Sequence, residues 1–525
     1  MLVGYVSDER YVALADILLE FENASGSVEA RSRATGAVYA EIAPGPYKVT
    51  LACRGFGSKS VQITVKEGEP YHFRLLSDGL WGYMWPKWVQ AGEKSEFRVH
   101  AVEAYKLELW RYGWTKEFIR TIGWYDEHGP RATMQISPDG DYTQTGIRWN
   151  TQGYSSPIHH QYLEAPARSG LYYFHAKTES GVFFSFPWIV APSRPQAQVA
   201  VLASNITWNA YNNFGGRSNY IHPDRCPPTP TVNARLDLKR YTDPTHRYYD
   251  TEEYAPLSFD RPEPINHVPE HVRVTDPIEG RAACHVAPTE WRLLGWLERE
   301  GFEYDLYAET QFHAGVLNLD EYRVLIISTH PEYWSKEMYI RLKAWVVERG
   351  GRLLYLGGNG LNCAVEFLDT YTVIYRNGAG GGPPTESRFH QYVESEANLL
   401  GIVYTDPGAM TAAPYRVVDA SHWVFTGTGL KSGDVFGERS LHMRVPGGAS
   451  GHETDKISPS SPRNVTLLAK GMNPNDGGAE MVYYETDSGG SIFSAGSICY
   501  PSSILVDDGV SKITANVLNR FLGLA

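Results

Sequence analysis

Four short segments carry side chains whose types could perform chemistry together. The strongest is STHPEYWS, residues 328–335, in which His330 and Glu332 follow the apolar run VLIIS. In a sheet of parallel strands ligands bind beyond the carboxyl ends of the strands, so both side chains should face a binding crevice. They lie two residues apart and point the same way in an extended chain. Such a pair can move protons, although it would also fit an ion pair at a helix start.

Two further segments should reach the same edge of the sheet. LGGNG, residues 356–360, brings Asn359 there with glycines that let backbone approach a ligand. TWNAYNNFGGRSNY, residues 207–220, follows another apolar run and presents Tyr211. Both have structural alternatives, since Asn359 would fit a left-handed turn and tyrosine is more often a packing residue. Neither is a nucleotide loop, because the G-x-G-x-x-G and P-loop spacings are absent.

A fourth segment, GHETD at residues 451–455, supplies Glu453 from a stretch dominated by Gly, Ser and Pro. Its carboxylate is either a general base or a solvated turn residue. The chain from Tyr211 to about residue 285 is long, polar and rich in Pro, Tyr and Asn. Loops of that length are usually functional or disordered, and the aromatic residues favour order, so we expect a wall of the site there.

The elements that must position these residues alternate between strand and helix over residues 196–525. This pattern predicts a mostly parallel sheet with helices on both faces. TEWRLLGWLERE, residues 289–300, carries its large apolar side chains on one helical stripe. Ser335 should cap a helix that the following glycine pair ends. The other expected elements are strands at AQVAVLAS, FEYDLYAE, YRVLIIST, RLLYLGGNG, AEMVYYET and GSIFSAGS, and a closing helix at DGVSKITANVLNRFLGL.

Residues 1–195 contain short alternating runs separated by turn residues, which indicates β-sandwiches. We expect one sandwich over residues 1–78 and a second over 79–195, where a Pro-rich linker leads into the α/β domain. Within the first, TGAVYAEIAPGPYKVTLACRGF resembles transthyretin-like or carboxypeptidase-regulatory-like domains. That resemblance implies a non-catalytic module. The expected architecture is therefore two β-sandwiches followed by a doubly wound α/β domain over residues 196–525.

Charge and cysteine content narrow the partners. The 525 residues carry a formal net charge of −12 with no basic stretch, which argues against nucleic acid or an anionic membrane as partner. The 5 cysteines are scattered without a C-x-x-C pair, which is typical of reduced thiols in a cytoplasmic protein. We expect no signal peptide, and no apolar run approaches the roughly 18 residues of a membrane span.

Six motifs together point to a known family. They are AYNNFGGRSNY, LSFDRP, HPEYWS, YLGGNG, ASHWVFTGTGL and GHETD. Their order and setting resemble the carboxy-terminal domain of the N,N-dimethylformamidase large (beta) subunit family over roughly residues 196–525. The resemblance implies a fold related to class I glutamine amidotransferases without their cysteine nucleophile. It also implies a small-molecule amide substrate and a homo-oligomer, with or without a small partner subunit.

The same resemblance implies a mononuclear ferric (Fe³⁺) site held by two tyrosine phenolates and one glutamate. Carried over by motif, Tyr211 and Glu332 are two of its ligands. The second tyrosine is one of Tyr248, Tyr249 and Tyr254, and Tyr254 is favoured because it lies nearest to LSFDRP. Glu263, directly after FDRP, is a further oxygen donor. Phenolate and carboxylate are hard donors suited to a hard cation.

The expected chemistry is metal-assisted hydrolysis of a small amide or related C–N bond. In it Glu453 moves the proton, while Asn359 and His330 steady the developing oxyanion. Two other interpretations remain open. In one, the sandwiches bind a carbohydrate or a partner and the α/β domain is catalytically idle. In the other, Cys363 or Cys499 is a nucleophile, although neither lies in the G-x-C-x-G turn and Cys363 is expected in a helix.

Overall fold

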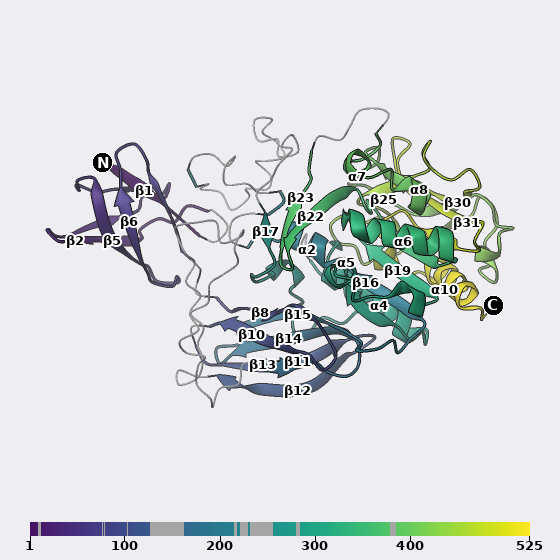
Figure 1. Cartoon of the computed structure of the whole chain (residues 1–525), viewed down its shortest axis with the longest axis horizontal. Helices are drawn as coiled ribbons and strands as arrows, with labels where there is room; N and C mark the ends of the chain where they lie inside the picture. The colour runs from purple at the N-terminus through teal and green to yellow at the C-terminus, as the bar shows by residue number, and fades with distance from the viewer. Residues whose placement is uncertain are drawn as a thin grey trace.

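Buried apolar side chains form three clusters, and the largest also includes side chains from strands of the second cluster, such as Trp88, Tyr112 and Ile189 (Figure 1). The structure is a computed structural model, rich in β-sheet and multidomain as the sequence predicted. The domain boundaries near residues 78 and 195 stay predictions. The structure describes every residue except 9–11, 76, 78, 102, 126–161, 215–217, 221–228, 231–255, 280–283, 379–384 and 525.

The first cluster lies between a four-stranded sheet, β3-β2-β5-β6, and a three-stranded sheet, β4-β1-β7. Along β6 buried and exposed side chains alternate strictly, because successive side chains of a strand point to opposite faces. The strands are β1 (Leu2–Ser7), β2 (Leu18–Asn23), β3 (Gly26–Arg31), β4 (Ala37–Tyr39), β5 (Gly45–Ala52), β6 (Lys59–Val65) and β7 (Tyr71–Arg74).

The second cluster lies between a five-stranded sheet, β12-β11-β14-β15-β9, and a three-stranded sheet, β13-β10-β8. The short alternating runs expected here form strands in the described part of this region, while residues 126–161 lie outside the described residues. The strands are β8 (Trp81–Trp85), β9 (Trp88–Gln90), β10 (Lys94–His100), β11 (Tyr105–Tyr112), β12 (Lys116–Tyr125), β13 (Tyr162–Glu164), β14 (Gly170–Thr178) and β15 (Phe183–Ala191).

The third cluster surrounds a nine-stranded sheet in the order β18-β16-β19-β21-β32-β31-β30-β26-β27. The first five strands are parallel, whereas the remaining four are antiparallel, so the expected mostly parallel sheet is a mixed one. The strands are β16 (Val199–Ala203), β18 (Asp305–Ala308), β19 (Val324–Thr329), β21 (Arg352–Gly357), β26 (Tyr415–Val417), β27 (Val435–Phe436), β30 (Thr466–Gly471), β31 (Glu480–Glu485) and β32 (Ser491–Ser494).

Helices cover this sheet in two groups that contact one another separately, α2, α5 and α6 in one and α4, α9 and α10 in the other. Strand order explains the separation of α4 from α5 and α6, because the chain moves outward from β16 to β18 through α4 and then back to β19 and β21 through α5 and α6. Right-handed crossovers in opposite directions place their helices on opposite faces. The helices are α2 (Asn205–Tyr211), α4 (Ala287–Arg299), α5 (Glu309–His313), α6 (Lys336–Arg349), α7 (Arg388–Tyr392), α8 (Ala397–Leu400), α9 (Tyr500–Ser503) and α10 (Asp508–Leu522).

Smaller elements surround the end of the sheet where the site lies. A four-stranded sheet runs β17-β23-β22-β20, and two strand pairs are β24 with β29 and β25 with β28. Their bounds are β17 (Leu257–Ser258), β20 (Tyr333–Ser335), β22 (Cys363–Asp369), β23 (Thr372–Tyr375), β24 (Val403–Thr405), β25 (Ala412–Ala413), β28 (Ser450–Gly451) and β29 (Thr454–Lys456), and the short 3-10 helices are η5 (Pro264–Asn266), η7 (Leu319–Glu321) and η8 (Trp423–Phe425).

The predicted helix after Ser335 is confirmed at both ends. The Ser335 side chain accepts a hydrogen bond from the Met338 N–H, and Gly350 ends α6 with φ of 75°. The helix predicted around Cys363 is wrong, because this residue begins β22. The reason is pairing, since β22 is parallel to β20 and forms a hairpin with β23, whose sequence TVIY consists only of β-branched and aromatic residues.

Candidate functional site

Glu332 is the centre of the candidate site, just beyond the carboxyl end of β19. Its side chain is buried, and four neighbours converge on it. Tyr211 Oη and Tyr220 Oη donate to Oε2 at 2.9 and 3.1 Å, and His330 Nε2 lies 3.2 Å from the same oxygen. Arg388 donates to Oε1 at 2.8 Å. The predicted proximity of Tyr211, His330 and Glu332 is therefore present in the structure.

The two phenol oxygens and Glu332 Oε2 form a small triangle. Its sides are 2.6 Å between Tyr220 Oη and Tyr211 Oη, 2.9 Å and 3.1 Å. An octahedral ion with metal–oxygen bonds of about 2.0 Å has ligand oxygens separated by about 2.8 Å. The triangle also has the dimensions of a hydrogen-bonded cluster. These three oxygens thus fit a small hard cation without any movement of the chain.

Burial raises the pKa of Tyr211 and of Tyr220 well above the usual value, and the adjacent charge of Glu332 raises it further. Both phenols therefore stay protonated at neutral pH when only protein groups surround them. A cation that displaced both phenol protons would reverse this preference, because a nearby positive charge favours the ionised form.

His330 connects this cluster to the other predicted residues. Its Nε2 lies 3.1 Å from Glu453 Oε2 and 3.4 Å from Asn359 Nδ2, and Asn359 Nδ2 donates to Glu453 Oε2 at 2.8 Å. Burial opposes the charge on His330, but Glu332 and Glu453 outweigh it and raise the pKa of the imidazole. His285 approaches the opposite ring nitrogen, with 3.2 Å between the two Nδ1 atoms.

Glu453 is ionised in this setting. Burial, the largest single influence, would raise the pKa of the carboxyl, but the hydrogen bond and charge of His330 and the hydrogen bond from Asn359 lower it to about 2. The alternative of a solvated turn residue does not describe this contact pattern. A carboxylate that is ionised and hydrogen-bonded can accept a proton from water or substrate when His330 supplies a compensating charge.

Strained backbone surrounds the site. Thr329, Asn359 and His452 are non-glycine residues with φ of 63°, 51° and 66°. Such conformations cost of order 1–3 kcal/mol each and persist where the surrounding structure holds them. Asn359 is thus both a turn residue and a site residue, since it adopts a left-handed conformation and also contacts His330 and Glu453. Its turn is fixed by a bond from its N–H to Asp455 Oδ1 at 2.8 Å.

Tyr211 is positioned by Arg261 of the FDRP motif. Tyr211 is the last residue of α2, and Arg261 is fully buried beside that helix end. Arg261 donates to the carbonyl oxygens of Asn209, Asn212 and Phe214 at 2.8–3.0 Å. These carbonyls lie at or beyond the end of the helix, where a cation also opposes the helix dipole.

The second tyrosine of the predicted ligand set falls outside the structure. Tyr254, Tyr248 and Tyr249 are not among the described residues. Glu263 is described, and its Oε1 lies 2.6 Å from Lys87 Nζ. This ion pair is not part of the site. Among the described residues, Tyr220 supplies a phenol oxygen beside Tyr211, at 2.6 Å. Sequence reasoning missed it, although it ends the segment TWNAYNNFGGRSNY that had been singled out.

Arg388 and His285 were also missed by sequence reasoning. Arg388 lies far along the chain from HPEYWS, and no motif distinguishes it from other arginines. His285 belongs to the long segment expected to line the site, where composition indicated a wall but no single residue. Both enter the site only through tertiary packing.

A cavity of about 780 Å³ opens over this cluster. Tyr211, Tyr220, Glu332, Asn359 and Glu453 all contribute to its lining. Three of them were predicted to share a crevice at the end of the sheet, so the cavity lies where parallel strands place ligand sites.

Neither cysteine proposed as an alternative nucleophile is suited to that role. Cys363 and Cys499 are fully buried. Burial raises the pKa of the Cys363 thiol to about 12 and raises that of Cys499 well above its usual value. The thiolate is the reactive form, so both groups are held in the unreactive state.

Among the described residues, no group of three or more His, Cys, Asp and Glu side chains is placed to hold a metal ion. The Tyr211, Tyr220 and Glu332 triangle draws two of its three oxygens from tyrosine. Over the same residues, none of the helices is long and apolar enough to cross a membrane.

Comparison with known proteins identifies one family. The sequence profile described as N,N-dimethylformamidase beta subunit-like, C-terminal, matches residues 106–511. The N,N-dimethylformamidase beta subunit of Paracoccus aminophilus is 26% identical over 407 residues, which cover 64% of this chain and 50% of that protein. The subunit of the same name from an Alcaligenes species is 27% identical over 296 residues, covering 46% of this chain and 38% of that protein. The aligned regions thus span half or less of these relatives.

Among solved structures, a β-galactosidase from Bacillus circulans sp. alkalophilus matches with 12% identity and a TM-score of 0.28, covering 44% of this chain and 27% of that one. A second β-galactosidase, from Rahnella sp. R3, matches with 14% identity and a TM-score of 0.27, covering 45% and 27%.

Proposed function

This chain belongs to the N,N-dimethylformamidase beta subunit-like family, and we propose that it is a metal-dependent hydrolase of a small amide or related C–N bond. The observation that carries the proposal is the junction of two phenols, Glu332 and the His330–Glu453 pair at one cavity. Metal-assisted hydrolysis requires hard oxygen donors that hold the ion and, next to them, groups that transfer a proton.

We propose iron as the metal, with Tyr211, Tyr220 and Glu332 as its protein ligands. Three hard oxygen donors suit a ferric ion, and three protein ligands leave positions open. The chemistry that such an ion supplies is polarisation of the amide carbonyl and activation of water. Tyr254 stays an alternative second tyrosine, since it lies outside the described residues.

The protein groups divide the remaining work. Glu453 is ionised and accepts the proton that water gives up as it attacks the carbonyl carbon. His330 Nε2 and Asn359 Nδ2 donate hydrogen bonds toward the oxygen on which negative charge develops. Arg388 holds Glu332 Oε1 at 2.8 Å and so fixes the rotation of that carboxylate. The proton on Glu453 then passes to the leaving amine, which restores the carboxylate.

Replacing Glu453 tests this division of roles. Glu453→Gln keeps the hydrogen bond from Asn359 but cannot accept a proton, so kcat on a hydrolysed amide should fall by about 10²- to 10⁴-fold. Metal content should stay at the wild-type level, because Glu453 is outside the proposed ligand set. Glu394→Gln, which alters a surface pair with Lys343, is the matched control. Turnover by Glu453→Gln at the wild-type rate, with metal content intact, would remove Glu453 from the mechanism.

Several finer predictions accompany this proposal. Three of them stay predictions from the sequence. They are a relation of the α/β domain to class I glutamine amidotransferases, assembly into homo-oligomers with or without a small subunit, and a cytoplasmic location. The curated relatives are named as beta subunits, which supports an assembly with other chains.

A further inference from the structure

The cavity over the site is far larger than the amide named in the family description. Dimethylformamide has five heavy atoms, and at about 30 Å³ per small molecule the size of water it needs on the order of 100–150 Å³. The cavity measures about 780 Å³. Pockets of about 300–1,000 Å³ enclose ligands of drug size. Most of this space is therefore not needed for the reacting amide itself.

One wall of the cavity consists of polar groups that are already engaged. Ser387 Oγ donates to Glu396 at 2.6 Å, and Arg388 is bound to Glu332. Asn377 Oδ1 accepts from Asn219 Nδ2 at 2.9 Å. Polar groups with internal partners gain little from a ligand, because a new bond replaces an existing one. This wall shapes the cavity but offers little binding energy.

Another part of the lining offers apolar surface close to the catalytic groups. Ala409, Met410 and the ring of Tyr404 supply it, together with the charged side chains of Asp406 and Arg444. Met410 is 45% exposed, and its N–H donates to the His452 carbonyl at 2.7 Å, next to Glu453. Exposed apolar surface beside a reacting centre gains free energy when a ligand covers it.

We propose that the substrate is an amide with an apolar or aromatic substituent of about five to ten heavy atoms that lies on Met410, Ala409 and Tyr404. This inference rests on the proposed amide hydrolysis and specifies the substrate class of that site. Covering Met410 adds binding energy at a distance from the reacting bond, and such energy raises kcat/KM.

A homologous series of substrates measures this effect. The probes are N-methyl-, N-propyl-, N-pentyl- and N-benzylformamide for the amine side, and N-methyl amides of acetic to hexanoic acid for the acyl side. Each methylene that becomes buried should raise kcat/KM about three- to fourfold in one of the two series. The full chain with its metal is the enzyme in every assay.

The variant pair Met410→Ala and Met472→Ala locates the effect. Met410→Ala should lower the ratio of kcat/KM for N-benzylformamide to that for N-methylformamide by about tenfold, since the contact area is removed. Met472 is a similarly exposed methionine, at 41%, outside the cavity lining, and its variant should retain the wild-type ratio. If the acyl series carries the effect, the corresponding ratio is the hexanoic over the acetic amide.

Three results would overturn the inference, and each rejects a different part of it. Hydrolysis of small amides with a flat or falling size series would reject the large substituent and leave the proposed hydrolase intact. No turnover of any amide by metal-loaded protein would reject the proposed function together with the inference. A rising series that Met410→Ala leaves unchanged would reject Met410 and its wall as the binding surface.

Discussion

The two carboxylate oxygens of Glu332 have different neighbours, which come from separate segments of the sequence. One oxygen accepts from two phenols and faces His330, while the other is held by Arg388. A buried carboxylate requires such compensation, because an unpaired buried charge is costly. The same crowding of oxygens around one position favours a cation there.

At the scale of single residues, the sequence predicts those site residues that belong to a motif or directly follow a strand. His330, Glu332 and Asn359 follow apolar runs, so the edge of the sheet that they share could be inferred from the sequence. Tyr220 and Arg388 could not be assigned, because their roles depend on loop paths that bring them over Glu332. Periodicity carries no information about such loops.

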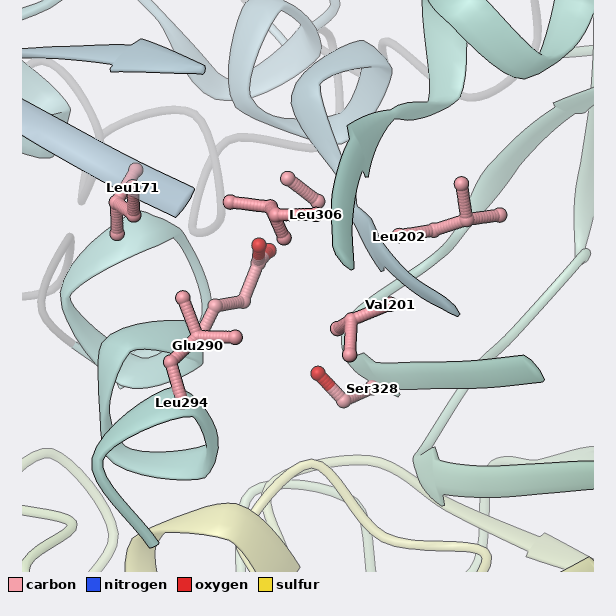
Figure 2. A pocket seen from close by; sticks show the side chains of 8 residues that line it. Leu171, Val201, Leu202, Glu290, Leu294, Leu306 and Ser328 are labelled. Atoms are coloured by element: carbon pink, nitrogen blue, oxygen red, sulfur yellow. The ribbon is translucent and has the colours of Figure 1, made fainter. Parts of the chain in front are cut away.

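Glu290, a buried carboxyl outside the site, gives a prediction on pH dependence. Figure 2 shows its side chain reaching from α4 in among Leu171, Leu306 and Val201, which line a cavity too small for a water molecule. Burial raises the pKa of Glu290 to about 8, although Trp208 donates to it at 2.8 Å. The folded protein therefore holds this proton at pH values where the unfolded chain has lost it.

Because the folded-state pKa of Glu290 is raised, its effect on stability runs opposite to that of an ion-paired carboxylate. Below about pH 4.3 both states are protonated; between there and about pH 8 the folded state loses stability, by about 3 to 5 kcal/mol in all. Glu290→Gln should remove this loss. Its stability relative to wild type should rise from pH 5 to pH 8.5 in denaturant titrations, whereas the exposed Glu67→Gln should show no such rise. A stability difference independent of pH would contradict the assignment.

At the scale of elements, local signals were sufficient where one helix or strand decides the outcome. The cap of Ser335, the glycine end of α6 and the strand ending at Thr329 follow from adjacent residues alone. β22 was misassigned because Cys363 starts a strand only through its partners β20 and β23. The antiparallel half of the main sheet escaped prediction for the same reason, since strand direction depends on tertiary pairing.

The end of α2 provides a test of how an element positions a ligand. Arg261 donates hydrogen bonds to the carbonyl groups of Asn209, Asn212 and Phe214. Arg261→Lys keeps the charge but loses most of the bonds, and we expect a loss of about 2–4 kcal/mol in the free energy of unfolding. It should also weaken metal binding, because Tyr211 ends α2. Calorimetry and metal titration measure the two effects.

Arg299→Lys is the matched control for Arg261→Lys, because Arg299 is a partly exposed arginine whose bonds to Leu505 and Ser511 lie away from the site. It should lower stability less and leave metal affinity at the wild-type value. If Arg261→Lys binds metal as wild type does, the geometry of Tyr211 does not depend on this arginine.

At the scale of the whole molecule, charged contacts join the second sandwich to the loop that holds α2. Arg98 Nη1 lies 2.5 Å from Asp260 Oδ1, and Lys87 Nζ lies 2.6 Å from Glu263 Oε1. Both acids flank Arg261 in the sequence. The FDRPE segment thus connects the sandwich on one side to Tyr211, the proposed metal ligand, on the other.

The first β-module has no comparable role in the site. Its apolar core draws all its fully buried members from residues 3–75, and none of its residues is in the described lining of the cavity. A chain of residues 79–525 should therefore fold and retain the metal content and amide turnover of the full chain. Turnover and metal analysis of that chain measure this, and loss of both in a folded, monodisperse protein would assign the module a direct role.

We propose that two tyrosines and Glu332 hold iron. Metal analysis together with the visible absorption spectrum of the purified protein tests it most directly, because ferric phenolate ligation produces a charge-transfer band. We expect stoichiometric iron and this band, both lost in Tyr211→Phe and Tyr220→Phe. Both should be retained in Tyr333→Phe, which removes a hydroxyl that bonds to Tyr220 at 2.5 Å. Colourless, metal-free protein would contradict the account and favour a binding protein with a catalytically idle α/β domain.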